Sequence, residues 1–166
     1  MSEASPRLGL PFLQPGQAQK ELFHNEALSL LDALVQPVVQ AIGGESPPAS
    51  PQLGLTWVVG EHPTGAWAGR AGAIATWTAG GWRFVAPIDG MAVWTTDDGM
   101  VARRAGGAWT RGILAGAEVR IGGIKVLDEQ QPPIPEPQSG TTIDAPGRSA
   151  IVAILMVLRK HGLIAS

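Results

Sequence analysis

The sequence predicts an α+β protein in which an N-terminal helix and a C-terminal helix flank a small antiparallel β module. An apolar pattern of helical period runs through residues 16–44. All six tryptophans and most of the glycines lie between residues 53 and 112, where no helix-length apolar pattern occurs. A proline-rich stretch and a second helical pattern follow. We therefore expect the β module to be a meander, built as a small barrel or a sandwich.

The composition argues against several classes of function. Charged residues make up 16% of the chain and the formal net charge is −2, whereas about a quarter of residues are charged in ordinary domains. This balance provides no basic face for nucleic acid and no polybasic patch for a membrane, so neither partner is expected. Cysteine is absent, which removes disulfides and thiolate metal sites. The longest apolar run, residues 150–158, is too short to span a bilayer.

A low charge also bears on assembly. An apolar surplus with few charged residues is typical of a chain that buries extra surface against other subunits. A tightly packed monomer would have the same composition, so composition alone leaves both readings open.

The N-terminal part divides into an extended arm and a helix. Three prolines within residues 1–15 disfavour helix there and predict the arm. In residues 16–44 apolar side chains recur at steps of three and four, which predicts an amphipathic helix. Pro37 removes a helix amide, so a kink or break is expected near Gln36. The apolar face is wider than one small sheet requires, and its candidate oligomer-interface residues are Phe23, Leu30, Leu34 and Val38.

Residues 45–52 are a stiff connector with three prolines, and residues 53–127 are the predicted β module. Glycine and aspartate supply the turns between its strands, because both residue types tolerate left-handed backbone. The predicted turns are residues 79–81, Asp97-Asp98-Gly99, Gly106-Gly107 and, in a last hairpin over residues 117–127, Gly122-Gly123.

Residues 128–143 contain four prolines and are expected to form an extended linker. A helix is predicted over residues 144–162, with Asp144 as its N-cap and Pro146 in its first turn. Basic residues precede Gly162, where the helix dipole favours cations. A helix this short is marginal alone in water, so we expect it to dock on its own module or on a neighbouring subunit.

Catalytic and metal-binding patterns are not found in the sequence. The three histidines, His24, His62 and His161, have no paired ligand spacing of the zinc type, and there is no nucleophile elbow or phosphate loop. Carboxylates for glycoside cleavage could come from Asp89, Asp97, Asp98 or Glu61, which all lie in loops of the β module. For Asp97 and Asp98 a role in the hairpin turn is the better explanation. We therefore predict no catalytic residue, no cofactor and no metal.

The tryptophans have two interpretations. They could form a platform on which sugar rings stack, or they could fill the core. Strand positions favour the core or packing on the sheet for Trp57, Trp77, Trp82 and Trp94. Trp67 differs because it lies in a glycine-rich loop near the cation Arg70, so Trp67 and Arg70 are the candidate glycan-binding residues. Anchoring of the loop is the alternative role for Trp67.

Several motifs resemble one family. They are residues 10–21 (LPFLQPGQAQKE), 24–28 (HNEAL), 31–35 (LDALV), 64–69 (TGAWAG) and 72–75 (GAIA), followed by Trp77, Gly81-Trp82 and Phe84. Together they are similar to the family DUF2793, a domain of unknown function, over roughly residues 10–94. The C-terminal residues 140–144 and the helix end at residues 158–164 resemble a terminal helix that recurs in phage-like proteins.

The resemblance implies a role in a particle. Members of the family occur in alphaproteobacterial prophages and gene transfer agents, which implies a virion structural protein of the head spike or tail fibre type. The expected partners are further copies of the chain, as a trimer or pentamer, and other capsid, spike or fibre components. The arm could then insert into the particle or a neighbouring chain.

The same resemblance implies a place and a target. The protein would be in the bacterial cytoplasm during assembly and then on the particle surface, attached to capsular polysaccharide of the host. A small carbohydrate-binding accessory domain is the alternative, and a hydrolase using loop carboxylates is a more distant one.

Overall fold

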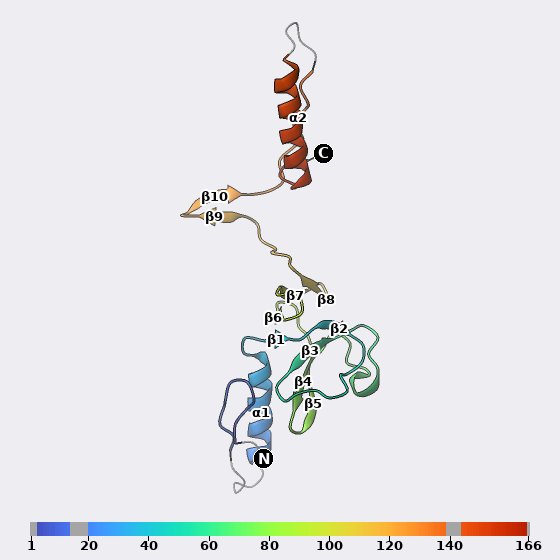
Figure 1. Ribbon diagram of the computed structural model, residues 1–166. Coiled ribbons are helices and arrows are strands. Elements are labelled where there is room, and N and C mark those ends of the chain that lie inside the picture. Colours follow the sequence, from blue (N-terminus) through green and yellow to red (C-terminus); the bar gives the residue numbers. More distant parts are fainter. Residues whose placement is uncertain (1–2, 14–19, 139–143, 166) are drawn as a thin grey trace. The chain divides into compact units, whose positions relative to one another are not determined.

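The computed structural model describes residues 3–13, 20–138 and 144–165 (Figure 1). The chain divides into two compact units, Met1–Ile113 and Leu114–Ser166, called the N-terminal and C-terminal units here. Two helices and several sheets confirm the α+β class with helices toward both ends of the chain.

The boundary between the units differs from the predicted one. The sequence placed the end of the β module at residue 127, whereas the N-terminal unit ends at Ile113. The hairpin expected over residues 117–127 does form, as strands β9 (Val119–Ile121) and β10 (Ile124–Leu127), but it belongs to the C-terminal unit. Its glycine turn resembles the turns of the β module, so local sequence alone does not separate them.

Helix α1 (Lys20–Leu34) is shorter than the helix predicted for residues 16–44, of which residues 16–19 lie outside the described part. It ends before Pro37, because a proline lacks the amide and clashes with the preceding turn. Gln36 has a φ of 47°, and among the described residues it is the one non-glycine with a positive φ. This left-handed residue turns the chain out of the helix. The break expected near Gln36 is therefore the end of the helix.

The crossing segment, residues 38–44, passes from one sheet to another. Its first strand, β1 (Val38–Val39), pairs in parallel with β6 (Ala92–Thr95). Its second strand, β2 (Ile42–Gly44), pairs in parallel with β3 (Thr56–Val59). The prediction that a helix continues to residue 44 is wrong here, because β-branched side chains after a proline suit an extended backbone.

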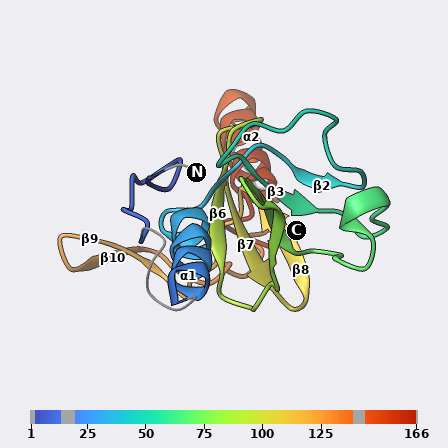
Figure 2. The ribbon, with the colours of Figure 1, turned by 90° about the horizontal axis from the view of Figure 1, so that it is seen from below.

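The N-terminal unit contains two four-stranded sheets, ordered β1-β6-β7-β8 and β2-β3-β4-β5. Tight turns join β4 to β5, β6 to β7 and β7 to β8 at the predicted glycines, so these hairpins are confirmed. Figure 2 shows β6, β7 and β8 side by side. No pairing among the described strands closes a barrel. The remaining strands are β4 (Ile74–Thr78), β5 (Gly81–Val85), β7 (Val101–Ala105) and β8 (Ala108–Arg111).

The core contains residues from both sheets. Its buried members are Val39 from the crossing segment, Val58 and Ile74 from one sheet, and Val93 and Ala102 from the other. Leu34, at the end of α1, packs against this cluster and anchors the helix to the sheets. One core therefore holds both sheets and the end of α1 in place.

Asp32 fastens the arm to α1. Its buried carboxylate accepts hydrogen bonds from the Ser5 hydroxyl at 2.8 Å and from the amides of Arg7 at 3.1 Å and Leu8 at 2.6 Å. The Arg7 guanidinium also donates to the Asp32 carbonyl oxygen. A buried carboxylate needs such donors. The described part of the arm, residues 3–13, is therefore folded against its own helix.

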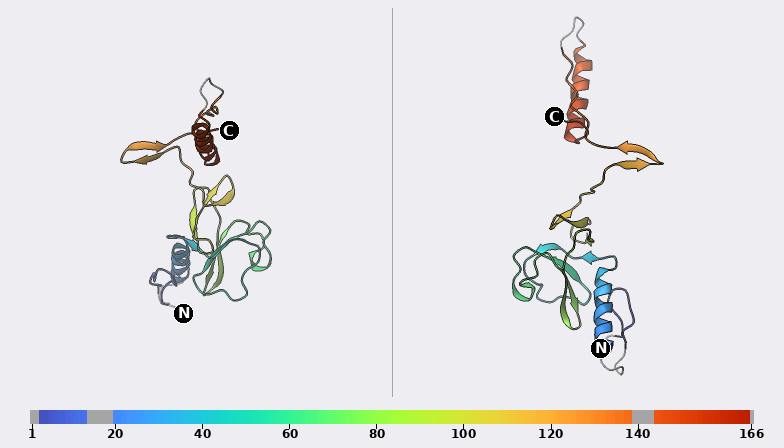
Figure 3. Two further views of the ribbon diagram at one scale, coloured as in Figure 1. Left: turned by 45° about the horizontal axis from the view of Figure 1, so that its top comes forward. Right: turned by 180° about the vertical axis from the view of Figure 1, so that it is seen from behind.

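The C-terminal unit contains the β9–β10 hairpin and helix α2 (Ala145–Lys160). Asp144 caps the helix as predicted, since its carboxylate accepts a hydrogen bond from the Gly147 amide at 3.0 Å. The predicted linker does not simply connect two parts. Residues 129–138 run back along α2, as Figure 1 and Figure 3 both show, while residues 139–143 lie outside the described part.

The length of this proline-rich run matches the helix beside it. Gln131 pairs with Ile164 near one end of α2, and the Gln138 carbonyl accepts from Arg148 at 2.5 Å near the other. A polyproline-type chain rises about 3.1 Å per residue and a helix about 1.5 Å per residue. The extended proline-rich run therefore spans the length of α2 with about half as many residues as the helix has.

Replacing Asp32 by Ala is predicted to free the arm and destabilise the N-terminal unit. The change leaves a buried hydroxyl and two amides without an acceptor, each at a cost of roughly 1–3 kcal/mol if it stays buried. Denaturant unfolding followed by tryptophan fluorescence measures the loss, and limited proteolysis detects release of residues 3–13. The exposed acid Glu61→Ala is the matched control. An unchanged unfolding midpoint and an uncleaved arm would contradict the proposed role of Asp32.

Candidate functional site

The tryptophan cluster consists of Trp57, Trp67, Trp77 and Trp82 in the N-terminal unit. The pairing Trp77↔Trp82 places two of them directly opposite each other on β4 and β5. The centroid distances are 5.1 Å for Trp77–Trp82, 5.5 Å for Trp57–Trp82 and 5.2 Å for Trp67–Trp82, all with rings tilted edge to face. Such edge-to-face geometry is the favoured packing of aromatic rings. Trp82 is therefore the centre of the cluster.

Trp67 is the buried member of this cluster. The loop containing it forms a short 3₁₀ turn, Gly65–Trp67, that lays the indole on the sheet, where Trp67 is 1% exposed. Val59 and Ala75 pack with it, and Gly44 lies close enough that a Cβ there would meet the indole at 3.5 Å. The prediction that Trp67 offers a sugar-stacking face is therefore corrected. The alternative, a loop anchor, fits the structure.

Arg70 lies on the surface near the cluster. Its guanidinium carbon lies 5.1 Å from the centroid of the Phe84 ring, within the range of a cation–π contact. The side chain is exposed and has donors free to face solvent. Of the two predicted glycan-binding residues, the structure leaves Arg70 accessible and Trp67 inaccessible.

The other strand tryptophans differ from one another. Trp57, Trp77 and Trp82 are half-buried, in line with the predicted sheet packing. Trp94 lies in the strand β6 but is 45% exposed, so of its two predicted roles the core is excluded. Trp109 was not singled out by the sequence, yet its indole Nε1 donates to the Gly72 carbonyl at 2.9 Å and ties β8 to the loop before β4.

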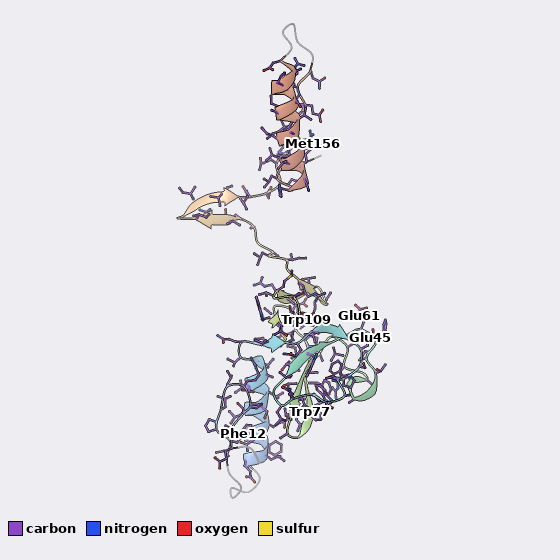
Figure 4. All side chains as sticks on the ribbon, viewed as in Figure 1. Phe12, Glu45, Glu61, Trp77, Trp109 and Met156 are labelled. Atoms are coloured by element: carbon purple, nitrogen blue, oxygen red, sulfur yellow. The ribbon has the colours of Figure 1, made fainter. Side chains whose placement is uncertain are left out.

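A groove of about 540 Å³ lies between the arm, α1 and the β4–β5 hairpin. Figure 4 labels Phe12 of the arm and Trp77 of β4, both of which line it. An ion pair between Arg83 of β5 and Glu26 of α1 joins two of its walls. One carboxylate oxygen of Glu21 is buried without a hydrogen-bond partner at this groove. The sequence did not indicate the groove, because three separate segments form it.

The loop carboxylates are engaged in turns. The Thr95 hydroxyl donates to Asp98 Oδ1, and this bond holds the pKa of the Asp98 carboxyl below its usual range, helped by the Met100 amide and Arg111. Asp89 accepts from the amides of Gly106 at 3.0 Å and Gly107 at 3.3 Å. Within the described residues, no group of three His, Cys, Asp or Glu side chains could hold a metal ion.

The predicted interface residues differ in exposure, and one of them lies outside the helix. Phe23 is 77% exposed, but Leu34 packs on the core and Leu30 is half-buried. Val38 lies in β1. The exposed large apolar residues here are Leu22, Phe23 and Leu31 of α1 and Val35, which directly follows the helix.

The C-terminal unit exposes far more apolar surface than its short core covers. Its buried apolar residues are Leu155 and Ile164. The exposed ones are Leu114, Val119, Ile121, Ile124, Val126, Leu127, Ile134, Ile151, Ile154, Met156, Val157 and Leu163. Twelve exposed large apolar side chains in one short unit are more than single scattered surface residues would explain.

The described part of the N-terminal unit is thus a two-sheet α+β module with an aromatic cluster on one sheet. A family model described as "Protein of unknown function (DUF2793)" matches residues 24–110. The match covers more than half of the 166 residues, and the chain belongs to this family. No curated protein matches the chain. Among the described helices, none combines the length and apolarity that crossing a membrane requires.

Replacing Trp67 by Ala is predicted to destabilise the N-terminal unit by about 3–5 kcal/mol, because it empties a buried indole site. The same change at the exposed Trp94 is the matched control and should cost about 0.5 kcal/mol or a little more. Urea unfolding of both variants gives the two free energies. A Trp67→Ala protein with unchanged stability would contradict the anchor role.

Replacing Asp98 by Asn is predicted to flatten the acid dependence of stability. A carboxyl whose pKa is lower in the folded than in the unfolded protein stabilises the fold above the unfolded pKa, about 3.9. That stabilisation is lost as the pH falls through the lower folded pKa. Urea midpoints between about pH 5 and pH 2 should therefore fall less steeply in Asp98→Asn than in the wild type. Asp97→Asn is the control, and equal slopes in the wild type and Asp98→Asn would refute the effect.

Proposed function

We propose that this chain is a structural subunit of a phage-like particle, either a gene transfer agent or a prophage virion. Several copies would form a head spike or fibre component and present the N-terminal unit outward. The other capsid, spike or fibre proteins would be its further partners. Assembly would take place in the bacterial cytoplasm, and the mature protein would lie on the particle surface.

The observation that carries the proposal is the apolar surface of the C-terminal unit. A core of so few buried residues does not stabilise a segment of this size, since even chains of about 70–80 residues draw only about 3–5 kcal/mol from their core. Burying one aliphatic side chain fully contributes about 1.5–3 kcal/mol, and association costs about 4–15 kcal/mol. Burying the exposed side chains together would therefore be enough to offset the free-energy cost of association with other subunits.

Host attachment is assigned to the N-terminal unit. Arg70 with Phe84, and the half-buried edges of Trp57, Trp77 and Trp82, lie on or beside one sheet. Aromatic edges and a free guanidinium are groups that contact sugar hydroxyls and ring faces. Capsular polysaccharide of the host is the proposed target, and Trp67 holds the site in shape without touching the glycan.

The aromatic cluster also suits the alternative function, a small carbohydrate-binding accessory domain. Such a domain acts beside an enzyme and has no need of a particle. The two proposals differ in where the protein resides, because only the particle subunit co-purifies with particles.

Purified particles from producing cells are predicted to contain this protein on their surface. Immunogold electron microscopy and mass spectrometry of the particles test its presence. Deleting the gene should leave DNA packaging intact and lower adsorption to host cells, and an Arg70→Ala protein should lower adsorption without leaving the particle. Absence of the protein from purified particles would contradict the particle role and favour the accessory domain.

A further inference from the structure

The sheet β1-β6-β7-β8 has one buried face and one exposed face (Figure 2). Val39, Val93 and Ala102 point into the core, where none of them is more than 2% exposed. Side chains along a strand alternate between the two faces of a sheet, so Trp94 and Val101 point the other way. They are 45% and 42% exposed. The second face, called the Trp94 face here, is therefore accessible from solvent.

Trp94 is held in place on this face by its neighbours. The register pairs it with Val38 of β1 on one side and with Val101 of β7 on the other. Residues directly opposite each other lie on the same face of a sheet. The turn after β6 also approaches the indole, because a Cβ on Gly99 would lie 3.8 Å from its Cζ2 atom. Two aliphatic side chains and a turn thus support the ring, and part of it stays exposed.

Arg103 is the one charged side chain on the Trp94 face of these four strands. It lies two residues beyond Val101, the partner of Trp94, and such diagonal neighbours are about 7–8 Å apart, within reach of aromatic and long side chains. Arg103 is exposed, and within the described residues its guanidinium has no hydrogen bond, ion pair or ring contact. An unengaged cation therefore lies beside an exposed indole.

The other residues around this pair are small. Ala92 and Thr110 pair with Arg103 on its two sides, and Ala105 pairs with Ala108 in the next row of the same face. All four are exposed. Short side chains leave room beside the indole, so a flat ring can lie against it without meeting a bulky neighbour.

We propose that Trp94 and Arg103 form a binding site for an acidic sugar, such as a uronic acid residue of a polysaccharide. The sugar ring would stack on the indole, and its carboxylate would accept two parallel N–H bonds from the guanidinium. The hydroxyl of Thr110, the strand partner of Arg103, can contact a sugar hydroxyl. The ligand class rests on the host attachment of the proposed function, but this site is a second one, on the other sheet from Arg70 and Phe84.

The charge of the Trp94 face favours an acidic sugar over a nucleic acid. Proteins bind single-stranded nucleic acid with aromatic side chains as well, but along a positively charged groove that follows the phosphates. Here Arg103 is the single cation of the face, and the chain has a formal net charge of −2. One guanidinium suits one carboxylate on a ring.

The side chains of the Trp94 face also favour a sugar over a protein partner. A stable protein interface buries about 800 Å² on each partner, around a cluster of large side chains. On the described strands of this face the exposed large apolar residues are Trp94 and Val101. A single indole with a cation beside it matches one sugar ring better than it matches a protein surface.

Titration of the full-length protein with oligomers of galacturonic acid and of glucuronic acid tests the site, with binding measured by isothermal calorimetry. The wild type should bind an acidic oligomer, and more NaCl should weaken binding because salt screens an exposed ion pair. Trp94→Ala should raise the dissociation constant about tenfold, through loss of the stacked ring. Arg103→Gln should raise it about threefold or more and remove most of the salt dependence.

Two controls isolate the ring and the charge. Arg120→Gln removes an exposed arginine from the C-terminal unit and should leave the dissociation constant within about twofold, a change of less than 1 kcal/mol. The methyl ester of the galacturonic acid oligomer keeps the sugar rings without the charge, so it should bind the wild type about as weakly as the acid binds Arg103→Gln. Urea unfolding of each variant verifies that the N-terminal unit is folded.

The possible failures are distinguishable. A wild type that binds neither acidic oligomer, or binding that persists unchanged in Trp94→Ala and Arg103→Gln, would overturn this site. Loss of binding in Arg70→Gln but not in Trp94→Ala would also overturn it and leave host attachment at Arg70. Tighter binding of a thymidine decanucleotide that depends on Trp94 would assign the face to nucleic acid instead. Failure of the particle role would appear separately, as absence of the protein from purified particles.

Discussion

The crossing segment, residues 38–44, is the constraint on which the N-terminal unit depends. It supplies a parallel edge strand to each of two sheets, and its Val39 is fully buried between them. Without this segment each sheet would be a separate antiparallel meander with one uncovered apolar face. Pro37 and the left-handed Gln36 make the crossing possible, because together they stop α1 and redirect the chain. Gly60 is needed as well, since a Cβ there would lie 2.6 Å from the Gly43 carbonyl oxygen.

The core between the two sheets fixes the positions of α1, the arm and the aromatic cluster. Leu34 holds one end of α1 on the sheets, and Asp32 holds the arm on α1. Trp67 anchors its loop on the sheet β2-β3-β4-β5, where it packs with Val59 and Ala75. The C-terminal unit has no comparable core, and its helix is stabilised on one side by a proline-rich run. The two units therefore differ in how they bury apolar groups: the N-terminal unit covers most of its own, and the C-terminal unit leaves most of its large apolar side chains exposed.

The sequence predicted what local chemistry decides. Turns such as Asp97-Asp98-Gly99 specify hairpins because only a few residue types accept the backbone they require, and Asp144 specified the start of α2 for a similar reason. The crossing segment was missed because Val38 and Ile42 continue the helical spacing of α1, while their strand partners lie far along the chain. The burial of Trp67 was missed because its loop reads as exposed until the sheet beneath it is known. The groove at Glu26 and Arg83 has no local signature at all, since it depends on how three segments meet.

The central claim is that the N-terminal unit is stable by itself whereas the C-terminal unit is stabilised by association. Hydrogen exchange of the full-length chain, measured at protein concentrations above and below dissociation of the assembly, tests it directly. The account predicts that amides of α2 and β9–β10 are protected only in the assembled protein, while those of β3, β4, β6 and β7 are protected equally at both concentrations. Equal protection of α2 and β9–β10 in the dissociated chain would contradict it.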